Sequence, residues 1–134
     1  MENKVWNVIP TVSVNNLEFG IERSNVREIL GKPKRIFKKT DNSVNTTDAY
    51  SDYHVYYTTD DKLEAIEFIG DNISISMNSH LIYPGTLNEA RNLLPDLDEY
   101  FGFYISKAGS IGLCVEEDRV TSVLAGCKDY YKTI

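Results

Sequence analysis

The sequence predicts an α+β protein in which two helix-then-strands repeats form one antiparallel sheet of about 7–8 strands, with the two helices on one face. Three observations favour this class. Two short segments show helical spacing of apolar residues, several strand-like segments follow each of them, and the two halves match in order. With 134 residues, 42% hydrophobic and 25% charged, the chain has the size and composition of one globular domain.

The first helix is indicated by a single apolar stripe. The first twenty residues alternate only weakly and predict short edge strands and turns. Val26, Ile29 and Leu30 then fall at positions i, i+3 and i+4, which places them on one helical face. A helix is therefore predicted from about Glu22, and Gly31 is expected to end it.

Strand-like segments follow this helix. Residues 35–39 predict a strand, and a polar loop separates them from a hairpin formed by residues 53–57 and 63–69. Residues 73–77 alternate regularly between apolar and polar side chains. This last segment is expected to be a strand with one buried and one exposed face.

The second helix has a clearer beginning than the first. Thr86 and Glu89 form a capping-box pattern, in which the two side chains satisfy free backbone amides at the helix start. Leu93 and Leu94 continue its apolar stripe, and Pro95 ends it. Three further strands are predicted after this helix, at residues 100–105, 110–115 and 120–125.

The two halves match each other at nearly constant shifts. A shift of 64 positions superposes the two helices, and a shift of 57 superposes the hairpins that follow them. Matched pairs include Leu17 with Leu81, Arg27 with Arg91, and Leu30 with Leu94. We therefore expect a single domain, residues 1–134, with internal repeat units of approximately 15–78 and 79–134.

Residues 19–33 resemble a known helix signature, Gly-hydrophobic-Thr-x-x-x-Val-x-x-x-Leu-Gly-x-Pro. The signature is that of the β-lactamase-inhibitor-protein-like and SmpA/OmlA-like repeat domains, and the matching residues are Gly20, Val26, Leu30, Gly31 and Pro33. Glu22 stands where the signature has a threonine. The resemblance implies a helix-on-sheet unit, here in tandem, that binds proteins and does not catalyse a reaction.

Charge is distributed unevenly along the chain. Residues 1–64 hold nine basic and ten acidic groups, and residues 65–134 hold five basic and ten acidic groups, so the second half carries −5 of the net −6. Charge of this sign disfavours nucleic acid and favours basic partners. One basic cluster runs against this trend, Lys32, Lys34, Arg35, Lys38 and Lys39, and its favoured interpretation is a solvated strand face.

No chemical motif stands out in the sequence. The two histidines and two cysteines have no metal-ligand spacing, and no nucleophile elbow or phosphate-binding loop is present. We therefore expect no enzyme activity, no metal and no cofactor. The start of the chain has no apolar signal core and no run is long enough to cross a membrane, so a cytoplasmic protein with reduced thiols is expected.

These features favour a protein-binding function. The leading expectation is a cytoplasmic immunity or inhibitor protein that binds and blocks a cognate bacterial toxin, a basic one such as a nuclease. The alternatives are a regulatory or structural protein-binding module without a toxin partner and a small-ligand-binding protein. The expected partner-binding residues lie in the acidic second half: Asp96, Asp98, Glu99, Tyr100, Tyr104, Glu116, Glu117 and Asp118.

Overall fold

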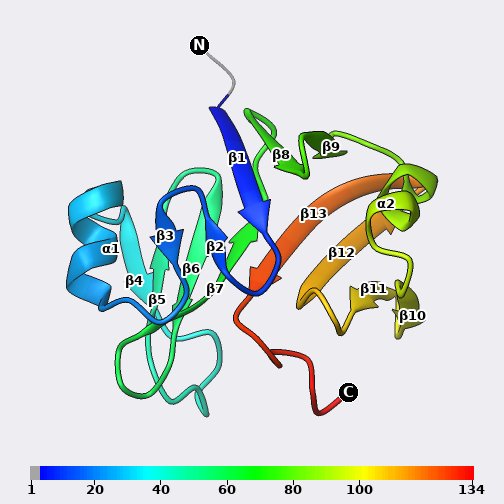
Figure 1. Cartoon of the computed structure of the whole chain (residues 1–134). Coiled ribbons are helices and arrows are strands. Elements are labelled where there is room, and N and C mark those ends of the chain that lie inside the picture. The colour runs from blue at the N-terminus through cyan, green and yellow to red at the C-terminus, as the bar shows by residue number, and fades with distance from the viewer. Residues whose placement is uncertain (1–3) are drawn as a thin grey trace.

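The computed structural model describes residues 4–134, and it shows thirteen strands in two sheets with two short helices (Figure 1). Strand accounts for 47% and helix for 11% of the protein. The predicted α+β class is therefore wrong, because the protein is mostly β. The predicted single sheet is wrong as well, because five strands form a second sheet.

The large sheet has eight antiparallel strands in the order β10-β11-β12-β13-β7-β6-β5-β4. The first-half strands in it are β4 (Arg35–Phe37), β5 (Thr47–Ala49), β6 (Tyr53–Tyr57) and β7 (Leu63–Phe68). Those of the second half are β10 (Asp98–Tyr100), β11 (Phe103–Ser106), β12 (Ile111–Glu116) and β13 (Arg119–Gly126). β13 pairs with β7, so this one pair of neighbouring strands joins the four strands of the first half to the four strands of the second half.

The small sheet has the order β3-β2-β1-β8-β9. Its members are β1 (Lys4–Ile9), β2 (Ser13–Val14), β3 (Leu17–Glu18), β8 (Ile73–Met77) and β9 (His80–Tyr83). β1 is its central strand and pairs in parallel with β8. For the first twenty residues the sequence predicted only short edge strands, because a parallel pairing between segments this far apart leaves no local turn signal. The strand predicted at residues 73–77 is confirmed as β8, but all five residues are buried, so the exposed face predicted for it is wrong.

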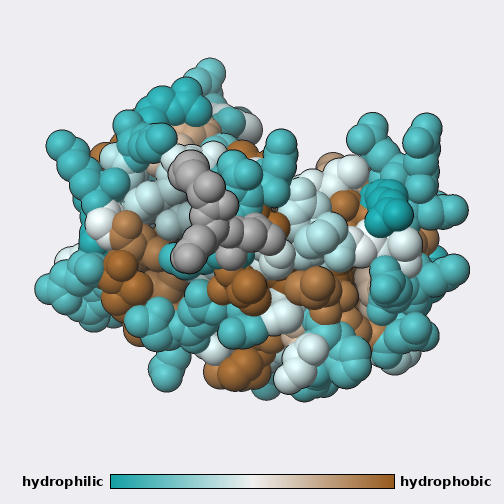
Figure 2. Space-filling view, turned by 90° about the horizontal axis from the view of Figure 1, so that it is seen from above, coloured by the Kyte–Doolittle hydropathy of each residue, from teal (hydrophilic) through white to brown (hydrophobic). Residues whose placement is uncertain are grey.

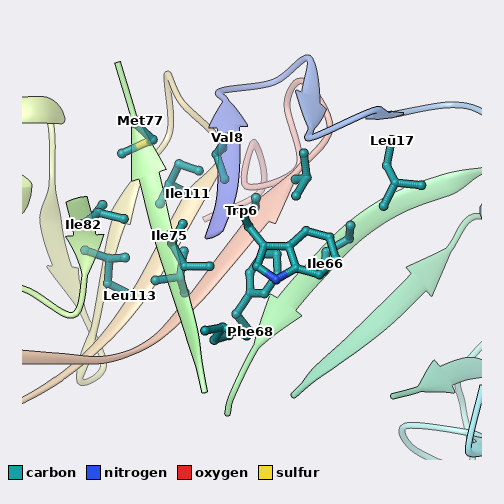
Figure 3. Close-up of a cluster of buried hydrophobic side chains, with 14 of the residues drawn as sticks. Trp6, Val8, Leu17, Ile66, Phe68, Ile75, Met77, Ile82, Ile111 and Leu113 are labelled. Carbon is teal, nitrogen blue, oxygen red and sulfur yellow. The ribbon is translucent and has the colours of Figure 1, made fainter. Parts of the chain in front are cut away.

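The core lies between the two sheets. Trp6 of β1 and Ile75 of β8 point toward Ile66 and Phe68 of β7 (Figure 3). The Trp6 ring lies 5.3 Å from the Phe68 ring and 4.9 Å from the Tyr53 ring, centroid to centroid. The small sheet therefore covers the middle of one face of the large sheet, which we call the inner face; the opposite side is the outer face.

The two helices are α1 (Arg23–Leu30) and α2 (Leu87–Leu93), and they lie at opposite ends of the molecule in Figure 1. The capping box predicted for the second helix is confirmed, since Thr86 Oγ1 accepts from the Glu89 amide and the Glu89 carboxylate accepts from the Thr86 amide. The first helix has no side-chain cap at Glu22. Helices of eight and seven residues cover little sheet, and the small sheet fills the space between them.

The beginning of each helix is tied to a hairpin turn in the same way. The Arg23 amide donates to the Asp61 carbonyl, and the Leu87 amide donates to the Asp118 carbonyl, both at 2.9 Å. Each helix also precedes four strands of the large sheet. The predicted arrangement of two helix-then-strands repeats in one sheet is nevertheless wrong, because β8 and β9 join β1, β2 and β3 in a second sheet. The predicted repeat boundaries, 15–78 and 79–134, stay a prediction.

The upper surface of the molecule carries no single dominant apolar patch. Figure 2 shows hydrophobic side chains in several separate areas, each bordered by hydrophilic ones. No helix among residues 4–134 is long and apolar enough to cross a membrane.

Candidate functional site

The β10–β11 hairpin ends in a two-residue turn. Tyr100 pairs with Phe103, so Phe101 and Gly102 form the turn between them. Their φ angles are +51° and +89°. Two consecutive positive φ values define a type I′ turn, which suits the right-handed twist of the strands and strongly prefers Asn-Gly or Asp-Gly.

Phe101 is an unusual residue for this position. A bulky side chain at positive φ is strained, and asparagine or glycine is the favoured residue. The β8–β9 turn shows the favoured choice, because Asn78 stands there with φ +50°. Phe101 is also fully exposed, with a relative accessibility of 101%, and Phe103 beside it is 51% exposed. Neither folding nor solubility explains an aromatic ring held in water at a strained turn.

Acidic side chains surround this hairpin. Asp98 and Glu99 are exposed on β10, which is the edge strand of the large sheet. The β12–β13 turn carries an exposed acidic run, Glu116, Glu117 and Asp118. The structure therefore places five predicted carboxylates around two hairpin turns.

The strand register brings the two turns to the same end of the sheet. Phe103 pairs with both Tyr100 and Cys114, so these three residues lie in a line across three strands. Neighbouring strands are about 4.8 Å apart, which puts Tyr100 about 10 Å from Cys114. Glu116 follows Cys114 by two residues at the same end. We call this region the hairpin end: residues 98–103 and 116–118.

The carboxylates of the hairpin end form no ion pair with any residue in 4–134. Among residues 4–134, the ion pairs join Arg23 and Arg27 to Asp48, Arg23 to Asp61, and Lys62 to Glu22. All of these lie around α1 and the β6–β7 turn, in the first half of the chain. The hairpin end therefore presents five carboxylates and two basic residues, Arg119 opposite Glu116 and Lys107 beside Tyr100, around exposed aromatic rings. Its net charge is negative.

Three predicted binding residues have side-chain contacts within the fold: Asp96, Tyr100 and Tyr104. Lys107 Nζ lies 5.6 Å from the centroid of the Tyr100 ring. The Asp96 carboxylate accepts from Ser106 Oγ at 2.7 Å and from the Ala108 amide at 3.1 Å. Burial opposes its ionisation, but these hydrogen bonds outweigh burial and hold the pKa of Asp96 below its usual value. The Tyr104 ring is half-buried against the core, and the Arg91 guanidinium lies 5.6 Å from its centroid.

Phe101 and Phe103 were not predicted as binding residues from the sequence. Both belong to an aromatic segment that is typical of a strand, and no Asn-Gly or Asp-Gly pair marks the turn. The Phe101-Gly102 pair between two aromatic residues was the available signal, since glycine supplies one of the two positive φ angles.

Groups that could perform chemistry are scattered. No group of three or more His, Cys, Asp or Glu side chains that could hold a metal ion is found within residues 4–134. Cys114 and Cys127 are free, half-buried thiols. The imidazole of His54 packs edge-on against Phe37, with 5.4 Å between ring centroids.

No family model, no curated protein and no solved structure matches this chain. The resemblance of residues 19–33 to the β-lactamase-inhibitor-protein-like repeats thus remains a prediction. Function has to be argued from the hairpin end itself.

Proposed function

We propose that this protein acts by binding a basic protein partner through the hairpin end. In this proposal it is an immunity or inhibitor protein, and the partner is a bacterial toxin whose working surface the hairpin end covers. The observation that carries the proposal is the fully exposed Phe101 at a strained turn, surrounded by five carboxylates that form no ion pair among residues 4–134.

Phe101 has the properties of an interface anchor. Protein–protein interfaces gain most of their binding energy from a few large side chains that fill pockets at the centre of the contact. A phenyl ring at the tip of a two-residue turn projects beyond the sheet and can enter such a pocket with little rearrangement. Phe103 and Tyr100 widen the apolar contact at its base.

The surrounding carboxylates supply attraction at long range. Uncompensated charge of one sign raises the association rate with a partner of the opposite sign and favours one orientation of approach. Toxins that act on nucleic acids need a basic surface, so an acidic inhibitor suits them. The combination of apolar tip and acidic rim therefore fits a basic protein better than a nucleic acid or an acidic protein.

The test is surface plasmon resonance between this protein and the product of the adjacent gene, which is where a cognate toxin would be encoded. Phe101→Asn should weaken binding by at least about tenfold, the range expected for an interface anchor. This variant introduces the residue that the turn prefers, so a loss of binding cannot come from misfolding.

The matched control is Ile36→Thr on β4, at the opposite edge of the same sheet, where the side chain is 52% exposed. It should bind like the parent. Equal binding by Phe101→Asn and the parent would remove the hairpin end from the interface. Co-expression should also restore growth of cells that carry the toxin; binding without such rescue would instead support the regulatory-module alternative.

A further inference from the structure

The outer face of the large sheet is partly covered by the end of the chain. A Cβ atom added to Gly126 would lie 2.7 Å from the Tyr130 ring, and one added to Gly112 would lie 2.2 Å from the Tyr131 hydroxyl. The two rings therefore rest directly on the backbones of β13 and β12. Only glycine leaves room for them at these positions.

A cavity of about 280 Å³ lies beside Tyr130. It is lined by Tyr130, Tyr56 and Glu64 and by the loop that connects β4 to β5. The remaining loop side chains are mostly small and polar, including Ser43 and Thr46. A space of this size suits a small ligand or a single side chain.

Glu64 reaches this cavity because of a β-bulge. Tyr56 pairs with Ala65 and Tyr57 pairs with Leu63, so β7 has one extra residue, Glu64, between the two pairs. Bulges of this kind redirect a side chain, and here the carboxylate lines the cavity.

The Glu64 carboxylate makes no hydrogen bond or ion pair with any residue in 4–134. Burial raises its pKa, and the charge of Lys39 offsets part of this effect. A partly desolvated carboxylate without a donor carries an energetic cost, and a cation that entered the cavity would reduce this cost.

One basic residue, Lys39, already lines the cavity. Lys39 Nζ lies 4.2 Å from the centroid of the Tyr56 ring, a cation–π contact. The Tyr56 hydroxyl donates to Glu67, a second carboxylate on the outer face. Lys39, Glu64, Tyr56 and Tyr130 thus line one cavity, and Glu67 is bonded to Tyr56. Carboxylates and tyrosine rings favour cations over anions.

We propose that this cavity is a binding site for an alkylammonium group, with Glu64 as its counter-ion, Tyr56 and Tyr130 as aromatic walls, and Lys39 as the resident group that the ligand displaces. The site lies on the outer face and is independent of the hairpin end. The ammonium group can belong to a free amine or to a lysine side chain of another protein, since both carry the same chemistry.

The test is an NMR titration of the protein with two probes, n-butylammonium chloride and a blocked Gly-Lys-Gly peptide. At least one probe should give saturable shifts confined to the cavity. Glu64→Gln should weaken binding by at least about tenfold, because one full counter-charge is lost. Lys39→Met keeps the apolar stem, removes the competing ammonium, and should strengthen binding.

The matched control is Glu28→Gln, which makes the same charge change on the exposed face of α1 and should bind like the parent. Tyr130→Leu is a second variant, which removes an aromatic wall and should weaken binding.

Tighter binding of the peptide would assign the site to a protein lysine, and tighter binding of butylammonium would assign it to a free amine. Absence of saturable shifts with both probes in the parent and in Lys39→Met, or equal binding by Glu64→Gln, would overturn the proposal. The assay involves neither Phe101 nor a protein partner, so its outcome is independent of the proposed function.

Discussion

Asp48 in β5 and Arg23 in α1 form a buried ion pair, with 2.6 Å between Asp48 Oδ1 and Arg23 Nη2. Arg27 adds two hydrogen bonds to the same carboxylate, of 2.9 and 2.7 Å, and the Tyr57 hydroxyl donates a further one at 3.1 Å. The Asp48 side chain is completely buried. The Asp48 carboxylate therefore holds α1 against the inner face of the large sheet through Arg23 and Arg27.

Asp48→Asn should be strongly destabilising. The substitution leaves Arg27 without a counter-ion and leaves Arg23 with only the exposed Asp61. Breaking a buried pair in this way costs about 3–5 kcal/mol. Urea unfolding at pH 7 measures the change in the free energy of unfolding. Asp41→Asn, in the exposed loop between β4 and β5, makes the same change outside any ion pair and should leave stability unchanged.

The same pair predicts a loss of stability in acid. Burial opposes ionisation of Asp48, but the hydrogen bonds and charges of Arg27 and Arg23 outweigh it and hold its pKa below the ordinary 3.8. A depressed pKa contributes stability that is present above pH 3.8 and is lost as pH falls through the folded-state pKa. The difference between parent and Asp48→Asn should therefore shrink only below about pH 4; a constant difference down to pH 2 would contradict this linkage.

Phe101→Asn should stabilise the protein even though it removes an aromatic residue. A strained backbone conformation costs about 1–3 kcal/mol, and asparagine tolerates positive φ much better than phenylalanine. Because Phe101 is fully exposed, no buried contact is lost in exchange. We expect the free energy of unfolding to rise by about 1 kcal/mol in urea titrations. Phe103→Asn, within a strand, should lower it, and a lower stability of Phe101→Asn would show that the ring supports the fold.

Local features of the sequence predicted several elements correctly. The helix expected from about Glu22 is confirmed as α1, and Gly31 follows it with φ +87°. The hairpin of residues 53–57 and 63–69 is confirmed as β6 and β7. Caps and short hairpins depend on residues close together in the chain, so the sequence carries their signal directly.

The small sheet and the β10–β11 turn could not be predicted in this way. β1 becomes a central strand only by pairing with β8, through a contact that no local pattern records. Residues 100–105 were expected to be one strand, and the structure has a turn at Phe101-Gly102 instead. Phenylalanine disfavours the positive φ that Phe101 adopts, so the sequence gives no turn signal at this position. Such a conflict between residue type and backbone conformation is expected at functional sites.

Reversing the charges of the β12–β13 turn should slow association with the partner. Glu116, Glu117 and Asp118 are exposed and have no ion pair among residues 4–134. The triple change to lysine should lower the association rate at low salt, with a smaller effect at high salt, where the Debye length falls to about 3 Å at 1 M. Surface plasmon resonance at several salt concentrations measures this. Unchanged association rates would exclude this turn from the steering surface, while the Phe101 contact would remain testable by itself.

Glu64→Gln should change stability in a pH-dependent way. Burial raises the pKa of the Glu64 carboxyl above its ordinary 4.5, and the charge of Lys39 only partly opposes this. A carboxyl with a raised folded-state pKa favours folding at low pH, and its contribution is lost as pH rises from 4.5 through the folded-state pKa. At pH 7 the ionised carboxylate therefore weakens the fold, and glutamine removes this cost without changing the shape of the side chain.

The variant should be more stable than the parent at pH 7, by less than about 1 kcal/mol because the carboxylate is partly exposed and keeps part of its hydration. At pH 4 the two proteins should have the same free energy of unfolding, since the parent carboxyl is then largely protonated in both states. Urea titrations at pH 7 and pH 4 measure the difference in the free energy of unfolding between variant and parent. For Glu28→Gln this difference should be the same at both pH values. A variant less stable than the parent at pH 7 would mean that the folded protein stabilises the Glu64 charge. The carboxylate would then have no unmet need for a cation, and one support of the alkylammonium site would be lost.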